Sequence, residues 1–528
     1  MTLPHLLMLC SAGLVAVYVG VIVHEAGHAL IGKAFGFVVT SVGLGVGRPF
    51  LIIPAGRARL FLGLVQPFQG ITFAFLPRLC TDRRRMAAFV AGGIAANGLC
   101  AAASLGLASR LPTGGPAAFF LMFAAANALL AISSLIPVRF RIGGAILRSD
   151  GMLLLEILRD GSLTPPPADV VQNARGCRRL WRAIGDRLMD RLNTLCAALA
   201  WIGLGSSARA ESLLAEAVAI DAPHPYLDWL EEVVRTDLAL ARGEWSEATA
   251  APPRAEGFCE GGRAEERYLL ALLQAGLLLG EGRQGEALAA FERLSVDPVG
   301  RARPELGLSA LTTHLRAACV IGDQAIVSAL LARYEAERQR FPSDVRDLAA
   351  YRASARYASL RGVDARDDYR CVLKAVASLA APWRDPDDRA AFLDAQRGLI
   401  EEARLALGAE AAAPLIEALE THQADRELLV EGESWRRWAL RLMLINVVSF
   451  GPLVLTALAI RPRGAPIIFL AAFLAIFTIM GSIHLILDFA VRKLFPSLKR
   501  LSSAILLLLA VSPWLGGLIF GVISTFMP

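Results

Sequence analysis

Two histidines and a glutamate lie close together near the N-terminus, in the segment His24-Glu25-Ala26-Gly27-His28. Residues i and i+4 share one face of an α-helix, so the imidazoles of His24 and His28 can bind one metal ion. A Zn²⁺ ion there would polarise a carbonyl and lower the pKa of a bound water, and the neighbouring Glu25 carboxylate would carry the proton to the leaving group. The segment therefore predicts a zinc hydrolase site with Glu25 as the catalytic residue.

The segment also closes an apolar run, because residues 1–23 contain no Asp, Glu, Lys or Arg. A carboxylate inside a membrane helix costs roughly 2.5 to 3.5 kcal/mol on insertion scales, so a polar cluster there indicates a function. The alternative is an interfacial cluster at the end of the helix, in which Lys33 pairs with Glu25.

A zinc site with two histidines needs a further ligand, and Asp150 is the candidate. Asp150 follows the third apolar run of the chain. The first and third runs would cross a membrane in the same direction, so His28 and Asp150 would lie at a similar depth. An Asp in front of an apolar run could instead cap a helix that begins at Met152. The two roles do not exclude each other.

Six apolar runs predict about six membrane-spanning helices, in a chain whose residues are 55% hydrophobic. Each run is near or above the roughly 20 residues that a helix needs to cross the hydrocarbon core of a bilayer. The runs are residues 1–23, Met86–Ser109, Leu111–Val138, Leu442–Ile460, Pro466–Leu487 and Leu501–Pro528. We expect a membrane core at 1–160, a soluble domain at 161–437 and three C-terminal membrane helices at 438–528.

Basic residues flank the runs on one side, such as Arg83 to Arg85 before the second run and Arg436 and Arg437 before the fourth. By the positive-inside rule, the middle domain is cytoplasmic. The first run lacks a basic residue before it and a cleavage-like site after it, which favours a retained helix over a signal peptide. We expect a multi-pass protein of a bacterial inner membrane. The net charge of +6 follows from this topology, and no aromatic-interleaved basic patch indicates nucleic acid.

Residues 38–79 differ in composition from the apolar runs. They are rich in glycine, β-branched and aromatic residues, which predicts short strands at Leu60–Val65 and Ile71–Leu76, with turns at Pro54–Gly56 and Pro67–Gly70. The fold class that we predict is an all-α polytopic membrane protein with a small membrane-associated β-hairpin region and a soluble α-helical repeat domain.

The middle domain has helical periodicity and a recurring glycine that could end a helix. This glycine recurs every 38 to 40 residues, at Gly205, Gly243, Gly282, Gly322 and Gly362. The period favours stacked helix-turn-helix pairs that resemble tetratricopeptide repeats, although it exceeds their 34 residues. The alternative is an irregular helical domain.

The first 160 residues resemble the site-2 protease family of intramembrane zinc metalloproteases. The resemblance rests on the HEAGH segment at 24–28 and the Asp-Gly pair at 150–151. Segments 41–49, 67–71, 92–97 and 134–137 look like the family's IGFGP, PxGGY, AGPxxN and NLLP motifs. The chain departs from the family by Ile94 in place of Pro, Ser134 in place of Asn, Arg148-Ser149 in place of Leu, and an extra stretch at 138–149.

The resemblance implies a Zn²⁺-dependent endopeptidase that cleaves a peptide bond within or near a transmembrane segment of a membrane protein. It implies that His24, His28 and Asp150 bind the metal, that Glu25 is catalytic, and that Asn97 holds the substrate or the oxyanion. We expect a transmembrane protein substrate in the lipid bilayer and a cytoplasmic protein partner on the repeat domain.

Two other classes of function are open. A non-proteolytic membrane scaffold would leave the zinc site vestigial, against which the intact Glu25 argues. A transporter is disfavoured because the two membrane halves do not repeat one another. His484 and Asp488 share a helix face and could form a hydrogen-bonded pair or a further metal site.

Overall fold

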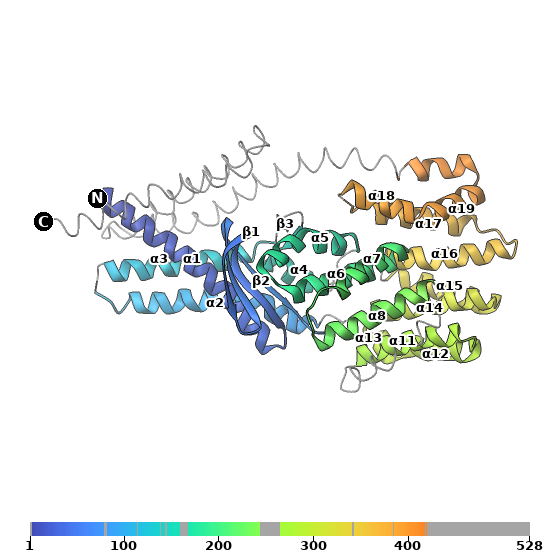
Figure 1. Cartoon of the computed structure of the whole chain (residues 1–528), viewed down its shortest axis with the longest axis horizontal. Helices are drawn as coiled ribbons and strands as arrows, with labels where there is room; N and C mark the ends of the chain where they lie inside the picture. Colours follow the sequence, from blue (N-terminus) through green and yellow to red (C-terminus); the bar gives the residue numbers. More distant parts are fainter. Residues whose placement is uncertain are drawn as a thin grey trace.

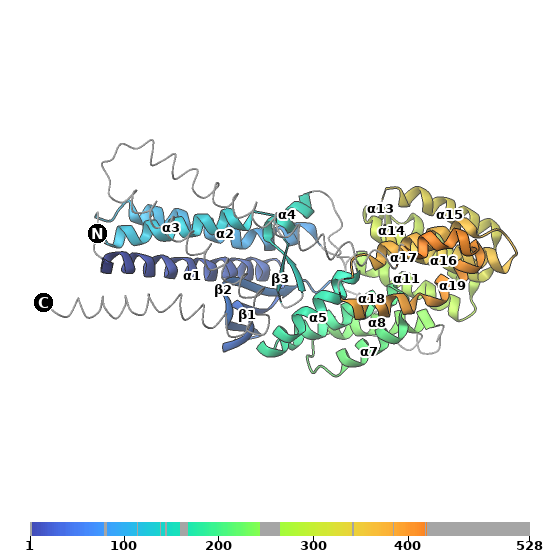
Figure 2. The same cartoon turned by 90° about the horizontal axis from the view of Figure 1, so that it is seen from above.

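The molecule is elongated, with apolar helices at one end, a β-sheet in the middle and a bundle of shorter helices at the other end (Figures 1 and 2). We describe it from a computed structural model. The structure describes residues 3–78, 82–112, 115–137, 139–142, 145–158, 167–242, 264–340, 343–383, 385–417 and 419.

Three apolar helices form the first end: α1 (Leu3–Ala34), α2 (Arg83–Ala108) and α3 (Gly115–Ser134). They pack against one another in all three pairs. Asp82 begins α2, because its side chain accepts a hydrogen bond from the backbone N–H of Arg85 and so satisfies a free helix donor. These helices carry the HEAGH segment and the glycines that face it.

The prediction of an all-α chain with about six membrane-spanning helices is wrong. In the described part of the chain, two helices are long and apolar enough to cross a membrane, Val15–Ala34 and Arg83–Ala108. The third predicted span, 111–138, contains α3, whose apolar stretch Phe119–Ser134 is shorter than those two helices. The last three predicted spans, at 442–460, 466–487 and 501–528, lie outside the described residues.

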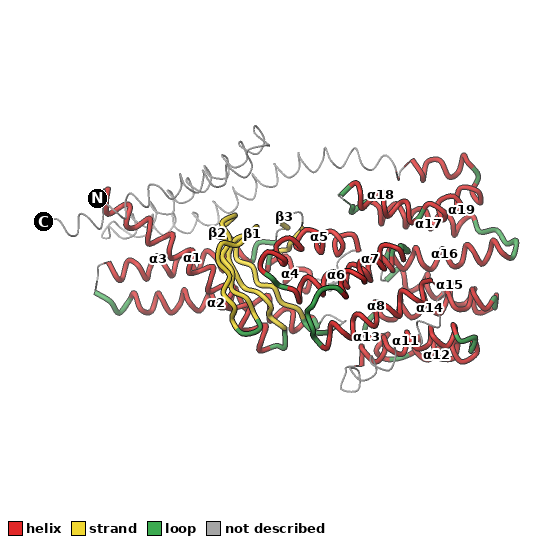
Figure 3. Tube along the Cα trace, in the orientation of Figure 1, coloured by secondary structure: helices red, strands yellow, loops and turns green. Residues whose placement is uncertain are grey.

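The predicted small hairpin is a more extensive sheet, which also contradicts an all-α class. It is built from β1 (Val38–Ala55) and β2 (Ala58–Phe75). Each strand bends and contributes two segments: residues 41–44 pair with 70–73 in antiparallel register and with 59–62 in the same direction. Residues 59–62 pair in turn with 51–54. The result is a mixed sheet of four segments (Figure 3).

The two outer segments of this sheet are 70–75 and 51–55. The predicted strands at 60–65 and 71–76 lie in the two halves of β2, and the bend between them falls at the predicted turn at 67–70. Gly56, with φ +63°, makes the tight connection between β1 and β2, where a residue with a side chain would be strained.

A second, smaller hairpin follows α3. It consists of β3 (Arg139–Ile142) and β4 (Ala145–Arg148), which pair in antiparallel register, and it leads into α4 (Asp150–Leu158). These strands occupy the extra stretch at 138–149. A hairpin returns the chain to where it began, so Asp150 comes back to the end of α3.

The middle domain is helical. Its helices are α5 (Pro167–Ile184), α6 (Arg187–Gly203), α7 (Ser207–Val218), α8 (Pro225–Arg242), α11 (Ala264–Gly280), α12 (Gln284–Val296), α13 (Pro298–Ala302), α14 (Pro304–Ile321), α15 (Gln324–Arg338), α16 (Asp344–Leu360), α17 (Arg366–Ala380), α18 (Pro386–Ala395) and α19 (Arg397–Leu407). The predicted helix-ending glycines 205, 282, 322 and 362 have positive φ angles and separate consecutive helices, whereas Gly243 lies outside the described residues.

The two ends of this helical domain meet. The indole of Trp201 on α6 stacks on that of Trp383, with ring centroids 5.2 Å apart, and the Gln396 side chain donates a hydrogen bond to the carbonyl of Leu204. In an open solenoid each repeat contacts only its neighbours. These helices therefore close on themselves, in a core that continues into the sheet through Phe61, Ile71, Phe73 and Phe75.

Candidate metal centre

The C-terminal part of α1 presents three polar side chains to the protein interior. His24, Glu25 and His28 are each at most 8% exposed. Each brings one ligand atom to within 4.8 Å of the others, as their spacing on the helix predicts. The alternative interfacial pair is not formed in the described chain, because Lys33 is exposed whereas Glu25 is buried and bonded elsewhere.

Glycines on α2 provide the space for the two imidazoles. A Cβ atom added to Gly93 would lie 2.5 Å from Nε2 of His28 and 2.7 Å from Nε2 of His24. Gly27 and Gly92 allow α1 and α2 to approach closely, since a Cβ on Gly27 would lie 2.4 Å from the Gly92 carbonyl oxygen. The small residues of α2 are thus part of the site.

Asp150 reaches the same point from the other side. The hydroxyl of Ser149 donates to the Ile136 carbonyl at 2.7 Å, and the Cβ position of Gly151 lies 2.0 Å from the Leu135 carbonyl oxygen. Only glycine allows this approach of α4 to the end of α3. Ser149 also accepts from the backbone N–H of Met152 and so takes the capping role considered for Asp150. The Asp150 carboxylate is free to face the imidazoles.

Three atoms of the types that bind metal ions form a triangle at this point. Oδ2 of Asp150 lies 2.9 Å from Nε2 of His24 and 3.3 Å from Nε2 of His28, and the two Nε2 atoms are 3.1 Å apart. Ligands at the usual zinc distance of about 2.0 to 2.1 Å in tetrahedral geometry are about 3.3 Å from one another. The three residues therefore fit a zinc ion with one further coordination position.

Electrostatics keep the third group ready to bind a cation. Burial raises the pKa of Asp150, but the contacts with His24 and His28 outweigh burial and lower this pKa to about 2. The carboxylate is therefore ionised at neutral pH. A buried anion between two imidazoles attracts a positive charge, which a metal ion supplies.

The outer nitrogen of each imidazole also has a partner. Nδ1 of His28 donates to the Phe89 carbonyl at 2.8 Å, which leaves Nε2 with its lone pair for a metal. Nδ1 of His24 lies 3.3 Å from the Asn97 amide, whose oxygen is buried without a hydrogen bond when the amide nitrogen faces the ring. If the amide is turned, Asn97 Oδ1 accepts a hydrogen bond from the N–H at Nδ1 of His24. The lone pair of His24 Nε2 is then left for a metal. Asn97 is placed to orient His24.

Residues of the β-sheet contact the side chain of Glu25. The hydroxyl of Thr72 on β2 donates to Oε2 of Glu25 at 2.6 Å, and a Cβ on Gly70 would lie 2.2 Å from Oε1. No sequence pattern indicated Thr72, which lies 47 residues from Glu25 along the chain. For Phe89 and Gly93, the one indication in the sequence was that they lie on the same predicted helix as Asn97. His484 and Asp488 lie outside the described residues.

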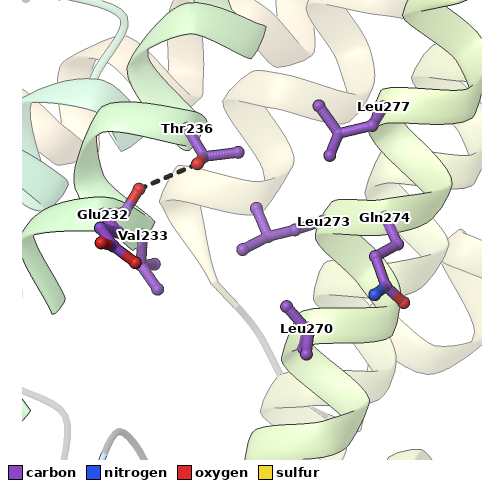
Figure 4. A pocket seen from close by; sticks show the side chains of 7 residues that line it. All are labelled: Glu232, Val233, Thr236, Leu270, Leu273, Gln274 and Leu277. Atoms are coloured by element: carbon purple, nitrogen blue, oxygen red, sulfur yellow. Dashed lines mark hydrogen bonds between the residues drawn. The ribbon is translucent and has the colours of Figure 1, made fainter. Parts of the chain in front are cut away.

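A cavity elsewhere in the molecule is unrelated to this cluster. Figure 4 shows Glu232, Val233 and Thr236 of α8 facing the leucines of α11 and Gln274. Its lining is mostly aliphatic, and the hydroxyl of Thr236 is already bonded to the carbonyl of Glu232. Glu232 is the one charged residue in this lining, and a single carboxylate does not make a metal site.

No family model, curated protein or solved structure matches this sequence. The resemblance to site-2 proteases therefore rests on the motif residues alone, and the geometry around His24, His28 and Asp150 is what bears on function.

Proposed function

We propose that this chain is a zinc-dependent endopeptidase that cleaves a peptide bond within or near a transmembrane segment of a membrane protein. The observation that carries the proposal is the triangle formed by His24, His28 and Asp150, with the Glu25 carboxylate beside it. The separations of the three atoms are those of ligands around one tetrahedral zinc ion, which supports a shared cation at this point.

His24, His28 and Asp150 would hold the zinc ion, which when bound would polarise the scissile carbonyl and acidify a water. Glu25 takes a proton from the attacking water and passes it to the amine nitrogen that leaves. Phe89 and Asn97 keep the two imidazoles in the tautomer that exposes Nε2. Burial of the cluster excludes bulk water and strengthens each of these interactions.

The apolar surface of α1 and α2 supports a membrane location. Leu30 is 69% exposed and Leu99 is 72% exposed, on two helices long enough to cross a bilayer. In this proposal α1 and α2 lie in a bacterial inner membrane, and basic residues place the helical domain in the cytoplasm. The substrate is then a membrane protein whose helix meets the site from the lipid.

The edge of the sheet suggests how such a substrate is held. A helical peptide bond is protected by its own hydrogen bonds until the helix unwinds. Segment 70–75 is an outer strand of the sheet and carries Thr72 next to Glu25. An unwound substrate that adds to this edge as a strand would have its backbone beside the carboxylate. Cleavage that persists after proline substitutions along 70–75 would contradict this mode of binding.

The helical domain would recognise the substrate's cytoplasmic part or a protein partner. Its closed arrangement leaves outer helix faces and loops for this contact. The sheet and the helical domain share a core, so binding at the domain occurs on the same body that carries the edge strand.

The test is the zinc content of the purified full-length protein, measured by mass spectrometry in detergent beside His24→Ala and Asp150→Ala. We expect about one zinc per chain in the wild type and much less in both variants, because each removes a ligand. Substrates would then be sought as membrane proteins that accumulate with Glu25→Gln. A folded wild type without zinc would favour the non-proteolytic scaffold, and retention of zinc by Asp150→Ala alone would place the third ligand elsewhere.

A further inference from the structure

The outer strand 70–75 has different neighbours on its two faces. Side chains alternate along a strand, so Ile71, Phe73 and Phe75 point to one face and Thr72 to the other. The first three are buried in the core of the helical domain, where Phe73 meets the indole of Trp181 with ring centroids 5.9 Å apart. The strand therefore stands between Glu25 and the helical domain.

Thr72 fixes the carboxylate of Glu25. Its Oγ1 lies 2.6 Å from Oε2 of Glu25 and 3.2 Å from the carbonyl oxygen of the same residue. A hydroxyl has one proton to donate, and the shorter contact to the charged acceptor is the stronger. Gly70 leaves just enough space for the other carboxylate oxygen. The carboxylate is thus held in one orientation.

The helical domain holds the neighbouring strand segment through Asp186. The register shifts between Val39 and Ser41, so Thr40 is an extra residue in a β-bulge. The bulge allows both Thr40 and Ser41 to donate to the same oxygen of Asp186, Oδ2. Oδ1 of Asp186 accepts from the backbone N–H of Met189 and caps α6. One buried carboxylate thus ties the sheet to the start of a helix.

We propose that Thr72 is a positioning residue for Glu25, and that α5 and α6 hold its strand so that the helical domain sets the orientation of the carboxylate. Its importance for catalysis rests on the proposed peptidase function. The contact itself is a property of the protein that can be measured without activity.

The test uses infrared spectra of full-length protein labelled with ¹³C-carboxyl glutamate, in which the difference from Glu25→Gln isolates the Glu25 band. Thr72→Val removes the hydroxyl at nearly constant shape, and Thr72→Ser retains it. We expect Thr72→Val to shift the carboxylate band and to lower kcat about 10-fold to 100-fold, with KM and zinc content unchanged. The substrate would be a single-span peptide with a fluorophore and quencher. Thr72→Ser should restore both readouts, and an unchanged band in Thr72→Val would overturn the proposal.

A second pair of variants tests the role of the helical domain. Trp181→Leu weakens the packing behind Phe73, and Phe291→Leu makes a comparable cut in a separate core of the same domain. We expect the first to shift the Glu25 band in the direction of Thr72→Val and the second to leave it in place. Equal bands in the two folded variants would refute the link to the helical domain. Band shifts in a protein that never cleaves the peptide would contradict the peptidase function and leave the positioning role intact.

Discussion

Buried polar groups are arranged differently in the metal-site region and in the helical domain. Around α1, Nε2 of His24, Nε2 of His28 and Oδ2 of Asp150 point at one another at about 3 Å. In the helical domain several buried charges meet opposite ones: the guanidinium of Arg191, for example, bonds to Asp228, Glu231 and a carbonyl oxygen.

This difference distinguishes a candidate binding site from a domain that supports it. Acceptors that face one another need a shared cation or proton, so such an arrangement costs stability unless something binds there. Matched ion pairs satisfy the groups that burial would otherwise leave without partners. The helical domain can therefore serve as a rigid body, and substitutions in the two regions should affect different measurements.

The largest effect is expected at Glu25. Glu25→Gln keeps the shape of the side chain and its contact with Thr72 but removes the base, so cleavage of the peptide should fall by about 10²-fold to 10⁴-fold. Zinc content should remain near that of the wild type, because the three ligands are untouched. The measurements are initial cleavage rates and zinc by mass spectrometry on the same preparation.

A matched control strengthens this prediction. Glu156 on α4 is ion-paired with Arg148, and Glu156→Gln should leave cleavage close to normal. A Glu25→Gln protein with undiminished cleavage would show that another group acts as the base.

The cluster of His24, Glu25 and His28 could be found from the sequence because these residues lie within one helical turn. The spacing of His24 and His28 places both on one face of a helix, with Glu25 beside them. Asp150 follows an apolar run of the sequence. Thr72 was not predictable, because a strand far along the chain brings it to Glu25. A threonine in a strand has no distinguishing pattern.

The fold was predicted only in part, and the reasons are physical. Hydropathy measures composition, so the whole run at 111–138 was predicted as a span, although the helix within it, α3, ends at Ser134. The strands of the sheet were recognised only in part, because the bend within each one hides a four-segment sheet. Helix-ending glycines revealed the helical units. The contact of Trp201 with Trp383 has no local signal, and it closes the domain.

The next largest effect is expected at Arg191, in the supporting region. Arg191→Met removes the buried partner of Glu231 and leaves it only the exposed Arg235, so the free energy of unfolding should fall by about 2 to 3 kcal/mol. This loss is smaller than the roughly 3 to 5 kcal/mol that breaking a fully buried pair costs, because Asp228 is half exposed. Zinc content should be unchanged in the folded protein. Denaturant unfolding followed by tryptophan fluorescence measures the loss.

Arg235 provides the comparison, since it pairs with the same Glu231 from an exposed position. Arg235→Met should cost no more than about 1 kcal/mol. Equal losses in the two variants would show that burial does not distinguish these pairs.

A smaller effect is expected at Asn97, which belongs to the metal-site region. Asn97→Leu removes the partner of His24 Nδ1, so zinc affinity should fall about 10-fold to 100-fold. Asn97→Asp keeps an acceptor for the Nδ1 proton and should lose less. Competition with a chelator of known affinity measures both. If the leucine variant binds zinc as tightly as the wild type, Asn97 does not orient His24, and its role as a substrate or oxyanion contact regains weight.

The smallest effect is expected at Cys177, in the core of the helical domain. Burial raises the pKa of its thiol to about 12, from an ordinary value of about 9. The folded state thus keeps the proton that the unfolded chain loses, so this thiol stabilises the fold below pH 9, and the stabilisation declines as the pH rises from 9 toward 12. Cys177→Ala should lose less stability between pH 8.5 and 10 than the wild type does, as measured by urea unfolding at each pH. The folded wild type should also react slowly with a thiol reagent at Cys177 at pH 8. Rapid modification there would mean that the helical domain opens readily, and a domain that opens in this way could not hold the strand of Thr72 against Glu25.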